Sequence, residues 1–462
     1  MLNVGQIRVT CLACLFTFFW QGQVCGKIVD QVLASLHASS GKTGKHLPGL
    51  LLALALILVT ITRMTTLFLP QGYRFAGVHC GLKADPNLLD LTLVVSDMPA
   101  TVAGTYTQNL VCGAAVVVDH PRTPGTGFKA MVANSRVAND CTGEQGVRDA
   151  YEMTALAAHY AGAEPDKALV MSTGVIGVML PMDKVRAGIA DAAKQLASDE
   201  ESFMRAARGI MTTDTVEKVV SRQLTLPSGE TVTLAGFCKG AAMIAPNMRT
   251  MLAMIMTDAA LEPAVAQKLL TDAVEESFNC VSIDGHTSPS DTVLLYANGA
   301  AVATPLTGEN LAQFTHVLQE LCVELAVKMP ADGEGVSHLI TIDVQGCATR
   351  DDAKKIARKV AEDVLVKTAI AGADPNWGRI ISATGNAGVQ FDPMEVSLTL
   401  NGFELFRNGE PVPFDKAAVA DSIRTNRDTH FLLTFQSGGE SIRFWTTDLT
   451  TEYVRLNSDY TT

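Results

Sequence analysis

The strongest constraint on the fold is the alternation of helical and strand patterns from Pro70 to the end of the chain. Short apolar runs such as 167–171 and 339–344, the second rich in β-branched residues, predict strands. Longer stretches with apolar residues at helical spacing, such as 262–277 and 310–328, predict helices. The alternation follows no tandem repeat and is typical of layered α/β domains. We therefore predict a layered α/β fold with mixed sheets.

Several further elements follow from the same patterns. Residues 91–95 and 113–118 are apolar and rich in β-branched side chains, which predicts two more strands. Residues 351–368 carry charges along one face and predict a single helix. From residue 389 onward the pattern favours strands, with Asn-Gly turn signals.

Charge and cysteine content exclude several function classes. The 462-residue chain has a net charge of −12 and no basic stripe, which argues against nonspecific nucleic-acid binding. Its ten cysteines are scattered, and only Cys11 and Cys14 lie close together without a second pair at zinc spacing. We predict free, mostly buried thiols, no metal site, and a reducing, cytoplasmic location.

The first 63 residues differ from the rest of the chain. Residues 9–26 and 47–62 are apolar but fall short of, or barely reach, the roughly 20 residues that a spanning helix needs. One interpretation is a signal peptide or membrane anchor. We favour an atypical extension, 1–63, outside the functional protein, because Met64-Thr-Thr-Leu resembles an ordinary start before the first globular segment.

Thr250 is the leading candidate for a catalytic nucleophile. A threonine hydroxyl reacts poorly without an adjacent base, and cutting the chain before a threonine frees an α-amino group that serves as that base. The alternative is structural: a helix N-cap followed by an apolar helix from Met251 onward.

Acyl transfer through Thr250 needs donors for a developing oxyanion and groups that hold a substrate. The turn at Thr173 and Gly174 offers a hydroxyl and backbone N–H groups, and we expect it to open a helix whose dipole favours an anion. Lys239 could bind a substrate carboxylate or polarise the nucleophile. Glu334, between two glycines, could bind a substrate ammonium group or orient the threonine. The respective alternatives are an ordinary N-cap, a surface lysine beside a turn, and a solvated turn.

These segments occur together in one known family. From about Leu69 to Thr462 the chain resembles the ornithine acetyltransferase / glutamate N-acetyltransferase family, the ArgJ family of arginine biosynthesis. The segments that carry the resemblance are 72–78, Ser96-Asp97, 141–146, 172–177, 211–215, 239–252, 277–279, 332–335, 366–368, 372–379 and 457–462.

The resemblance implies an ArgJ/DmpA-like fold and a precursor that cuts itself between Arg249 and Thr250. The products would be an α chain, 64–249, and a β chain, 250–462, that stay together. Members of the family usually have alanine where this chain has Arg249. By similarity, Thr250 is the nucleophile, Thr173 and Gly174 form the oxyanion hole, and the substrate-binding residues are Thr213, Lys239, Thr250, Glu334, Asn457 and Thr462.

The activity implied is acetyl transfer from N-acetylornithine to glutamate through an acetyl-threonine intermediate. Acetyl-CoA is implied as a second acetyl donor, with no cofactor and a heterotetramer of two α and two β chains. Three alternatives remain open. They are a monofunctional ornithine acetyltransferase, an amidohydrolase or aminopeptidase that uses the same threonine with water as acceptor, and a membrane-anchored or noncatalytic protein.

Overall fold

The computed structural model describes residues 67–245 and 251–459. They belong to one compact unit, Leu67–Thr462. The predictions for residues 1–63, Arg249, Thr250 and Thr462 lie outside the described residues.

An eight-stranded mixed sheet forms the larger part of this unit. Its strand order is β4-β3-β2-β8-β7-β6-β5, with β1 paired to β2. The β3–β4 and β7–β8 pairs are parallel and the others antiparallel, so the prediction of a mixed sheet is confirmed. The strands are β1 (Tyr73–Val78), β2 (Leu91–Tyr106), β3 (Gly125–Asn134), β4 (Ala168–Ser172), β5 (Lys218–Thr225), β6 (Thr231–Lys239), β7 (Leu252–Ala259) and β8 (Thr292–Val302).

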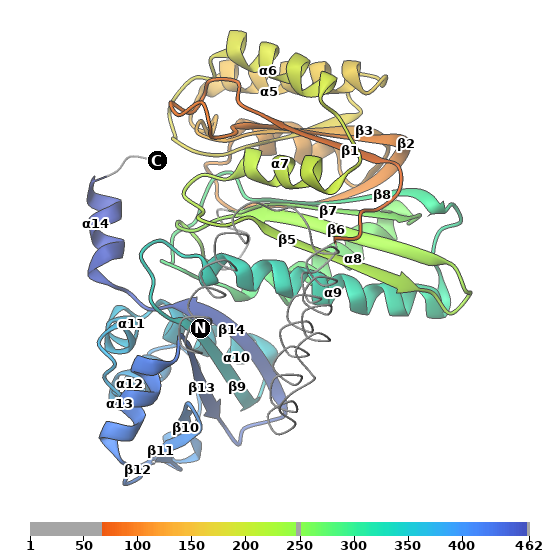
Figure 1. Cartoon of the computed structure of the whole chain (residues 1–462). Helices are drawn as coiled ribbons and strands as arrows, with labels where there is room; N and C mark the ends of the chain where they lie inside the picture. Colours follow the sequence, from red (N-terminus) through yellow and green to blue (C-terminus); the bar gives the residue numbers. More distant parts are fainter. Residues whose placement is uncertain (1–66, 246–250, 460–462) are drawn as a thin grey trace, which may run out of the picture. The chain divides into compact units, whose positions relative to one another are not determined.

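The long strand β2 connects two layers of this sheet. Its first half pairs with β1 and β3, its last six residues pair with β8, and the register shifts between Val95 and Ala100. The core between the layers takes side chains from both, among them Phe75, Phe237 and Tyr296. The two strand layers lie one above the other in Figure 1. The layered α/β prediction is therefore confirmed.

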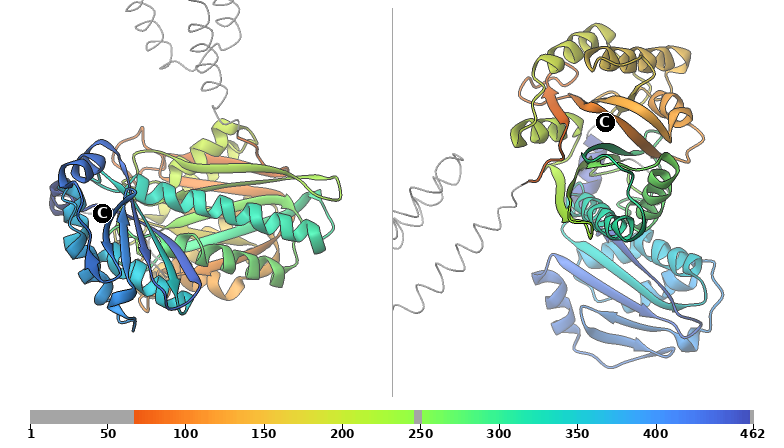
Figure 2. Two further views of the ribbon diagram at one scale, coloured as in Figure 1. Left: turned by 90° about the horizontal axis from the view of Figure 1, so that it is seen from below. Right: turned by 90° about the vertical axis from the view of Figure 1, so that its right-hand side faces the viewer.

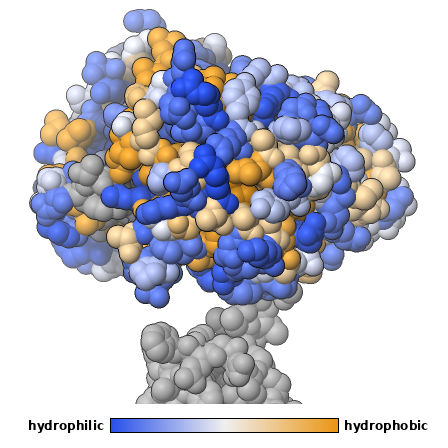
Figure 3. All heavy atoms as spheres, turned by 90° about the horizontal axis from the view of Figure 1, so that it is seen from above, coloured by the Kyte–Doolittle hydropathy of each residue, from blue (hydrophilic) through white to orange (hydrophobic). Residues whose placement is uncertain are grey.

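Helices cover both outer faces of this sandwich. On one side, α5 (Gly143–Tyr160) and α6 (Met182–Lys194) pack on the β1–β4 layer; on the other, α8 (Pro263–Glu275) and α9 (Gly308–Ala331) cover the second layer (Figures 1 and 2). A further helix, α7 (Glu200–Ile210), packs against β1. Hydrophilic residues dominate the surface on the α5–α6 side (Figure 3), as expected for helices that bury only one face.

A second sheet of six strands, in the order β12-β11-β10-β13-β9-β14, follows in the C-terminal part. The Asn-Gly pairs at 401–402 and 408–409 have positive φ angles and close its hairpins, as their sequence predicts. The strands are β9 (Leu339–Cys347), β10 (Ser397–Leu400), β11 (Phe403–Arg407), β12 (Glu410–Pro411), β13 (Asp428–Thr434) and β14 (Glu440–Thr447), and the helices are α10 (Arg350–Glu362), α11 (Val364–Ala371), α12 (Trp377–Gly385), α13 (Lys416–Thr425) and α14 (Thr451–Asp459).

Two predictions of secondary structure are wrong, and a third, that strands predominate after 389, is confirmed only in part. Residues 113–118 form a short helix, α4 (Ala114–Asp119), that packs on α5, so tertiary contacts override its β-branched composition. The predicted helix 351–368 divides at Asp363, whose carboxylate caps α11 by accepting from Leu365 N and Val366 N. The strands after 389 are interrupted by α13 and α14.

The described residues also bear on the cysteines and on membrane insertion. The seven described cysteines are free, four of them buried. Within 67–245 and 251–459, no helix is long and apolar enough to cross a membrane.

Candidate active site

A central strand, β7, begins two positions after the candidate nucleophile in the sequence. The alternative that the residues after Thr250 form a helix is wrong, because β7 is a strand between β6 and β8 with all its residues buried. A strand covered on both faces has a continuous apolar run, which is hard to distinguish from a buried helix in sequence. The amide of Met251 donates to Asp291 Oδ1 at 2.5 Å, which fixes the entry to this strand.

The turn after β4 leaves few donors uncommitted. The N–H groups of Thr173, Val175 and Gly177 donate to backbone carbonyls at 3.1, 3.0 and 2.9 Å. Among the described residues, the N–H of Gly174 has no such acceptor. Gly174 has a φ of +131°, and a Cβ there would lie 2.1 Å from the carbonyl carbon of Arg136. Only glycine fits at this position. Its N–H is the group that the sequence predicts as an oxyanion donor.

The predicted contribution of a helix dipole at this turn is wrong. The next helix, α6, begins only at Met182, with Pro181 as its N-cap. Because the effect of the dipole falls off within the first turn of a helix, it does not reach Gly174. Any oxyanion stabilisation here comes from the local N–H and from the hydroxyl of Thr173, a residue only 5% exposed.

Asp140, which sequence reasoning missed, joins this turn to the entry of β7. Its backbone carbonyl accepts from Gly177 N, and its carboxyl group accepts from Ser290 Oγ at 2.7 Å. Ser290 precedes Asp291, the partner of the Met251 amide. Burial raises the pKa of Asp140 to about 6. Asp140 is one acidic residue in a loop and belongs to no recognisable motif, so the sequence did not indicate this role.

Lys239 is buried at the end of β6, so the surface-lysine alternative is wrong. Its backbone is in register with Leu252 of β7, and the residue is 3% exposed. Burial lowers the pKa of its ammonium group, while the charges of Asp214 and Asp291 oppose that shift. A lysine in such an environment offers a desolvated positive charge to a substrate carboxylate.

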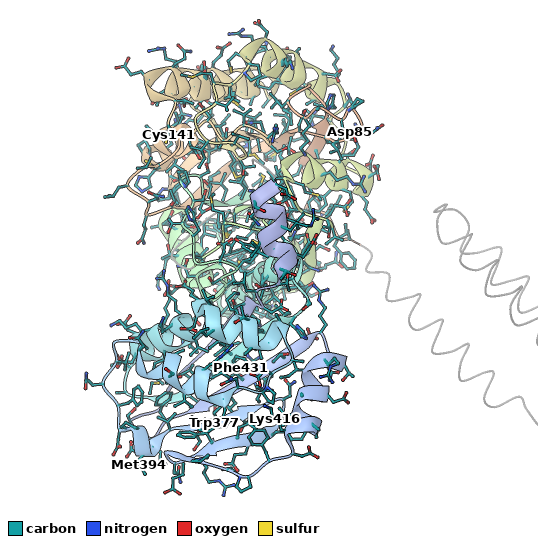
Figure 4. All side chains as sticks on the ribbon, turned by 90° about the vertical axis from the view of Figure 1, so that its left-hand side faces the viewer. Asp85, Cys141, Trp377, Met394, Lys416 and Phe431 are labelled. Atoms are coloured by element: carbon teal, nitrogen blue, oxygen red, sulfur yellow. The ribbon has the colours of Figure 1, made fainter. Side chains whose placement is uncertain are left out.

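Glu334 and Asn457 come together although they lie far apart in sequence. Asn457 Nδ2 donates to Glu334 Oε2 at 2.9 Å, and Glu334 N donates to the carbonyl of Ala241 at 2.8 Å, two residues after Lys239. Figure 4 looks onto this end of the unit, where α14 lies across the front below the labelled Cys141 and Asp85. Glu334 is half-buried and Asn457 is exposed, so this pair lies at the rim of the site.

Asp284 holds the segment before the candidate cut against the C-terminal helix. Its carboxylate accepts from Met243 N at 2.6 Å, from Ile244 N at 3.0 Å and from Tyr453 OH of α14 at 3.1 Å. The same aspartate begins the loop 284–289. An acidic residue before a glycine is an ordinary turn signal, so its sequence did not indicate this role.

The remaining predicted residue, Thr213, is half-buried beside Asp214. Asp214 accepts from Gly240 N at 2.7 Å, so the 212–215 segment adjoins Lys239. A cavity of about 280 Å³ borders Gly174 and Thr212. Within the part of the chain that the structure describes, no group of three His, Cys, Asp or Glu side chains could hold a metal ion.

Comparison with known proteins places this arrangement in a family. The ArgJ family profile matches residues 74–462. The arginine biosynthesis bifunctional protein ArgJ of Rhodopirellula baltica is 44% identical over 401 residues, which cover 86% of this chain and 97% of that protein. The ArgJ protein of Bacillus subtilis is 40% identical over 396 residues, 85% of this chain and 96% of that protein.

A solved structure is also similar in sequence. The ornithine acetyltransferase of Mycobacterium tuberculosis, complexed with ornithine, is 37% identical, covers 38% of this chain and 92% of that chain, and superposes with a TM-score of 0.35. The profile match and the identity to curated relatives extend over most of the residues that carry the site. The chain belongs to the ArgJ family.

Proposed function

We propose that the protein transfers an acetyl group from N-acetylornithine to glutamate in arginine biosynthesis. Its relatives named as arginine biosynthesis bifunctional proteins match 85–86% of the chain. The ArgJ family profile spans every described candidate site residue. The products are ornithine and N-acetylglutamate. The word bifunctional in the relatives' names supports a second reaction, in which acetyl-CoA acetylates glutamate.

The observation that carries this proposal is that the segments of Lys239, a buried cation, and Glu334, a carboxylate, are bound to each other. Lys239 is the last residue of β6. The backbone N–H of Glu334 donates to the carbonyl of Ala241, two residues after Lys239, so the segment that carries the Glu334 carboxylate is bound beside the end of β6. N-acetylornithine, ornithine and glutamate each carry at least one carboxylate and at least one ammonium group. A buried cation and a rim carboxylate suit such amino acids, and Asn457 donates to that carboxylate.

The chemistry proceeds through Thr250 in two half-reactions. The chain first cuts itself between Arg249 and Thr250, which frees the α-amino group that acts as base. The Thr250 hydroxyl then attacks the acetyl carbonyl, and its proton passes through the α-amino group to the departing amine as the C–N bond breaks. The oxyanion is stabilised by Thr173 and Gly174. The amine of glutamate attacks the ester, and the hydroxyl of Thr250 is restored.

The strand order supports two chains that remain associated after the cut. Strands β7 and β8, downstream of Thr250, lie between β2 and β6, which are upstream. Separation would break two strand pairings in the middle of one sheet. We propose an α chain, 64–249, and a β chain, 250–462, assembled as a heterotetramer in the cytoplasm, acting on small molecules without a cofactor.

The test uses the full chain and three reactions. Ornithine release from N-acetylornithine in the presence of glutamate measures transfer, and acetyl-CoA with glutamate measures the second activity. Acetate release without glutamate measures hydrolysis. The proposal predicts glutamate-dependent ornithine release with little acetate. Acetate release that is independent of glutamate would establish the hydrolase instead, and transfer without acetyl-CoA activity would establish the monofunctional enzyme.

A further inference from the structure

A buried ion cluster lies beside the residues assigned to substrate binding. Lys218 Nζ is 2.5 Å from Asp214 Oδ1 and 2.6 Å from Asp332 Oδ2. The side chains of Lys218 and Asp214 are fully buried, and that of Asp332 is 9% exposed. Neither the ammonium group nor the carboxylates are used in the acetyl-transfer steps.

The Asp214 end of the cluster holds the segment of Lys239. Asp214 Oδ1 accepts from Gly240 N at 2.7 Å, directly after Lys239, and Oδ2 accepts from Thr212 N at 3.0 Å. Gly240 has a φ of +147°, so the chain turns sharply as β6 ends. One carboxylate therefore binds the backbone directly before Thr213 and directly after Lys239, the two predicted substrate residues.

The Asp332 end holds the segment of Glu334. Asp332 follows α9 and accepts from Thr215 N at 3.0 Å, and the Thr215 hydroxyl also donates to it. Glu334, two residues later, reaches across to the carbonyl of Ala241 through its amide. The 332–334 loop is therefore bound both to the 214–218 segment and to the end of β6.

The charged groups of the cluster stabilise one another in their ionised forms. Burial alone would raise the pKa of Asp214, but Lys218 and Lys239 lower it, so the carboxylate stays charged. Burial alone would lower the pKa of Lys218, but Asp214 and Asp332 raise it. Such buried ion pairs contribute little net stability, because desolvation offsets their attraction, and their best-attested use is to fix one arrangement.

We propose that Lys218 is a positioning residue that sets the spacing between Lys239 and Glu334, the two charges that receive an amino-acid substrate. The cluster crosses the candidate cut, since Asp214 and Lys218 lie upstream of Thr250 and Asp332 lies downstream. It keeps the two halves of the pocket in register after the chain is cut. This inference rests on the proposed function, which assigns Lys239 and Glu334 to the substrate.

The test is Lys218→Met in the full chain, with Lys328→Met as the matched control. Lys328 lies on α9 near the same loop, but its side chain is 38% exposed and its carboxylate partner, Glu324, is 3.7 Å away. For Lys218→Met we expect KM for both N-acetylornithine and glutamate to rise and kcat/KM to fall roughly 10- to 100-fold, the cost of misplacing a substrate. Self-cleavage and kcat change less, and the control keeps wild-type constants.

Two results would overturn the inference. A Lys218→Met enzyme with a lower melting temperature but unchanged KM values would show a purely structural role. If that variant fails to fold, Asp332→Asn replaces it, because it keeps the shape and leaves Lys218 paired with Asp214; unchanged KM values in Asp332→Asn also refute the proposal. Failure of the proposed function is distinguishable, since the wild-type chain would then show no transfer.

Discussion

Replacing Gly174 by alanine tests whether the turn after β4 supplies the oxyanion donor. At a φ of +131°, a Cβ would lie 2.1 Å from the carbonyl carbon of Arg136 and 2.3 Å from its oxygen. The backbone conformation alone costs an alanine about 1–3 kcal/mol. Since real Cβ atoms do not approach backbone this closely, the turn must shift, and the Gly174 N–H shifts with it. Loss of one oxyanion donor lowers turnover about 10²- to 10³-fold.

The assay is steady-state ornithine release, with a melting curve and a denaturing gel for each variant. Gly177→Ala is the matched control, because Gly177 also has positive φ, +80°, but a Cβ there meets nothing within 4 Å. We expect Gly177→Ala to lose some stability and keep its turnover. For Gly174→Ala we expect both slower self-cleavage and the loss of turnover. A processed Gly174→Ala enzyme with wild-type turnover would refute the role of this N–H.

Further predictions concern the nucleophile, its partners and the His338–Asp448 pair. Thr250→Ala should abolish both cleavage and transfer on gel and assay, and a cleaved, active variant would remove Thr250 as nucleophile. Thr173→Ala should lower turnover roughly 10²-fold with little change in KM, whereas an unchanged kcat would exclude its hydroxyl. Lys239→Met should raise KM for glutamate at least tenfold, because it removes the positive charge that receives the substrate carboxylate; an unchanged KM would contradict its role. His338 has its pKa raised by a hydrogen bond to Asp448, so its contribution to stability is full below about pH 6.5 and is lost as pH rises through the folded-state pKa. The difference in melting temperature between wild type and His338→Gln should therefore be larger at pH 6 than at pH 9, and equal differences would refute the pairing.

Much of the fold could be predicted from the sequence, because a long segment with regularly spaced apolar residues buries one face of a helix or a strand. The helices at 262–277 and 310–328 and the strand at 339–344 were confirmed, since their patterns are long or have strong β propensity. The strand predicted at 113–118 was wrong, because a short run of six residues that ends in three valines fits a strand or a packed helix equally well. The choice depends on contacts with α5, which local sequence does not contain.

Prediction of the site was limited in the same way, because local sequence does not contain tertiary contacts. Resemblance to a family identified Lys239 and Glu334, but the residues that hold them came only from the structure. Asp214 and Lys218 are four residues apart, a spacing that on a helix would predict an ordinary surface pair. Here Lys218 begins a strand and its side chain is buried against Asp332, more than a hundred positions away in sequence. Such a contact depends on the tertiary fold and has no local signal.

The most direct test of the central claim, a threonine nucleophile freed by self-cleavage, is an intact-mass spectrum of the purified full chain, with the first residue of each fragment determined. We predict two fragments that co-purify, the downstream one beginning at Thr250. A single uncut chain that still transfers acetyl groups, or a fragment that begins at another residue, would contradict it.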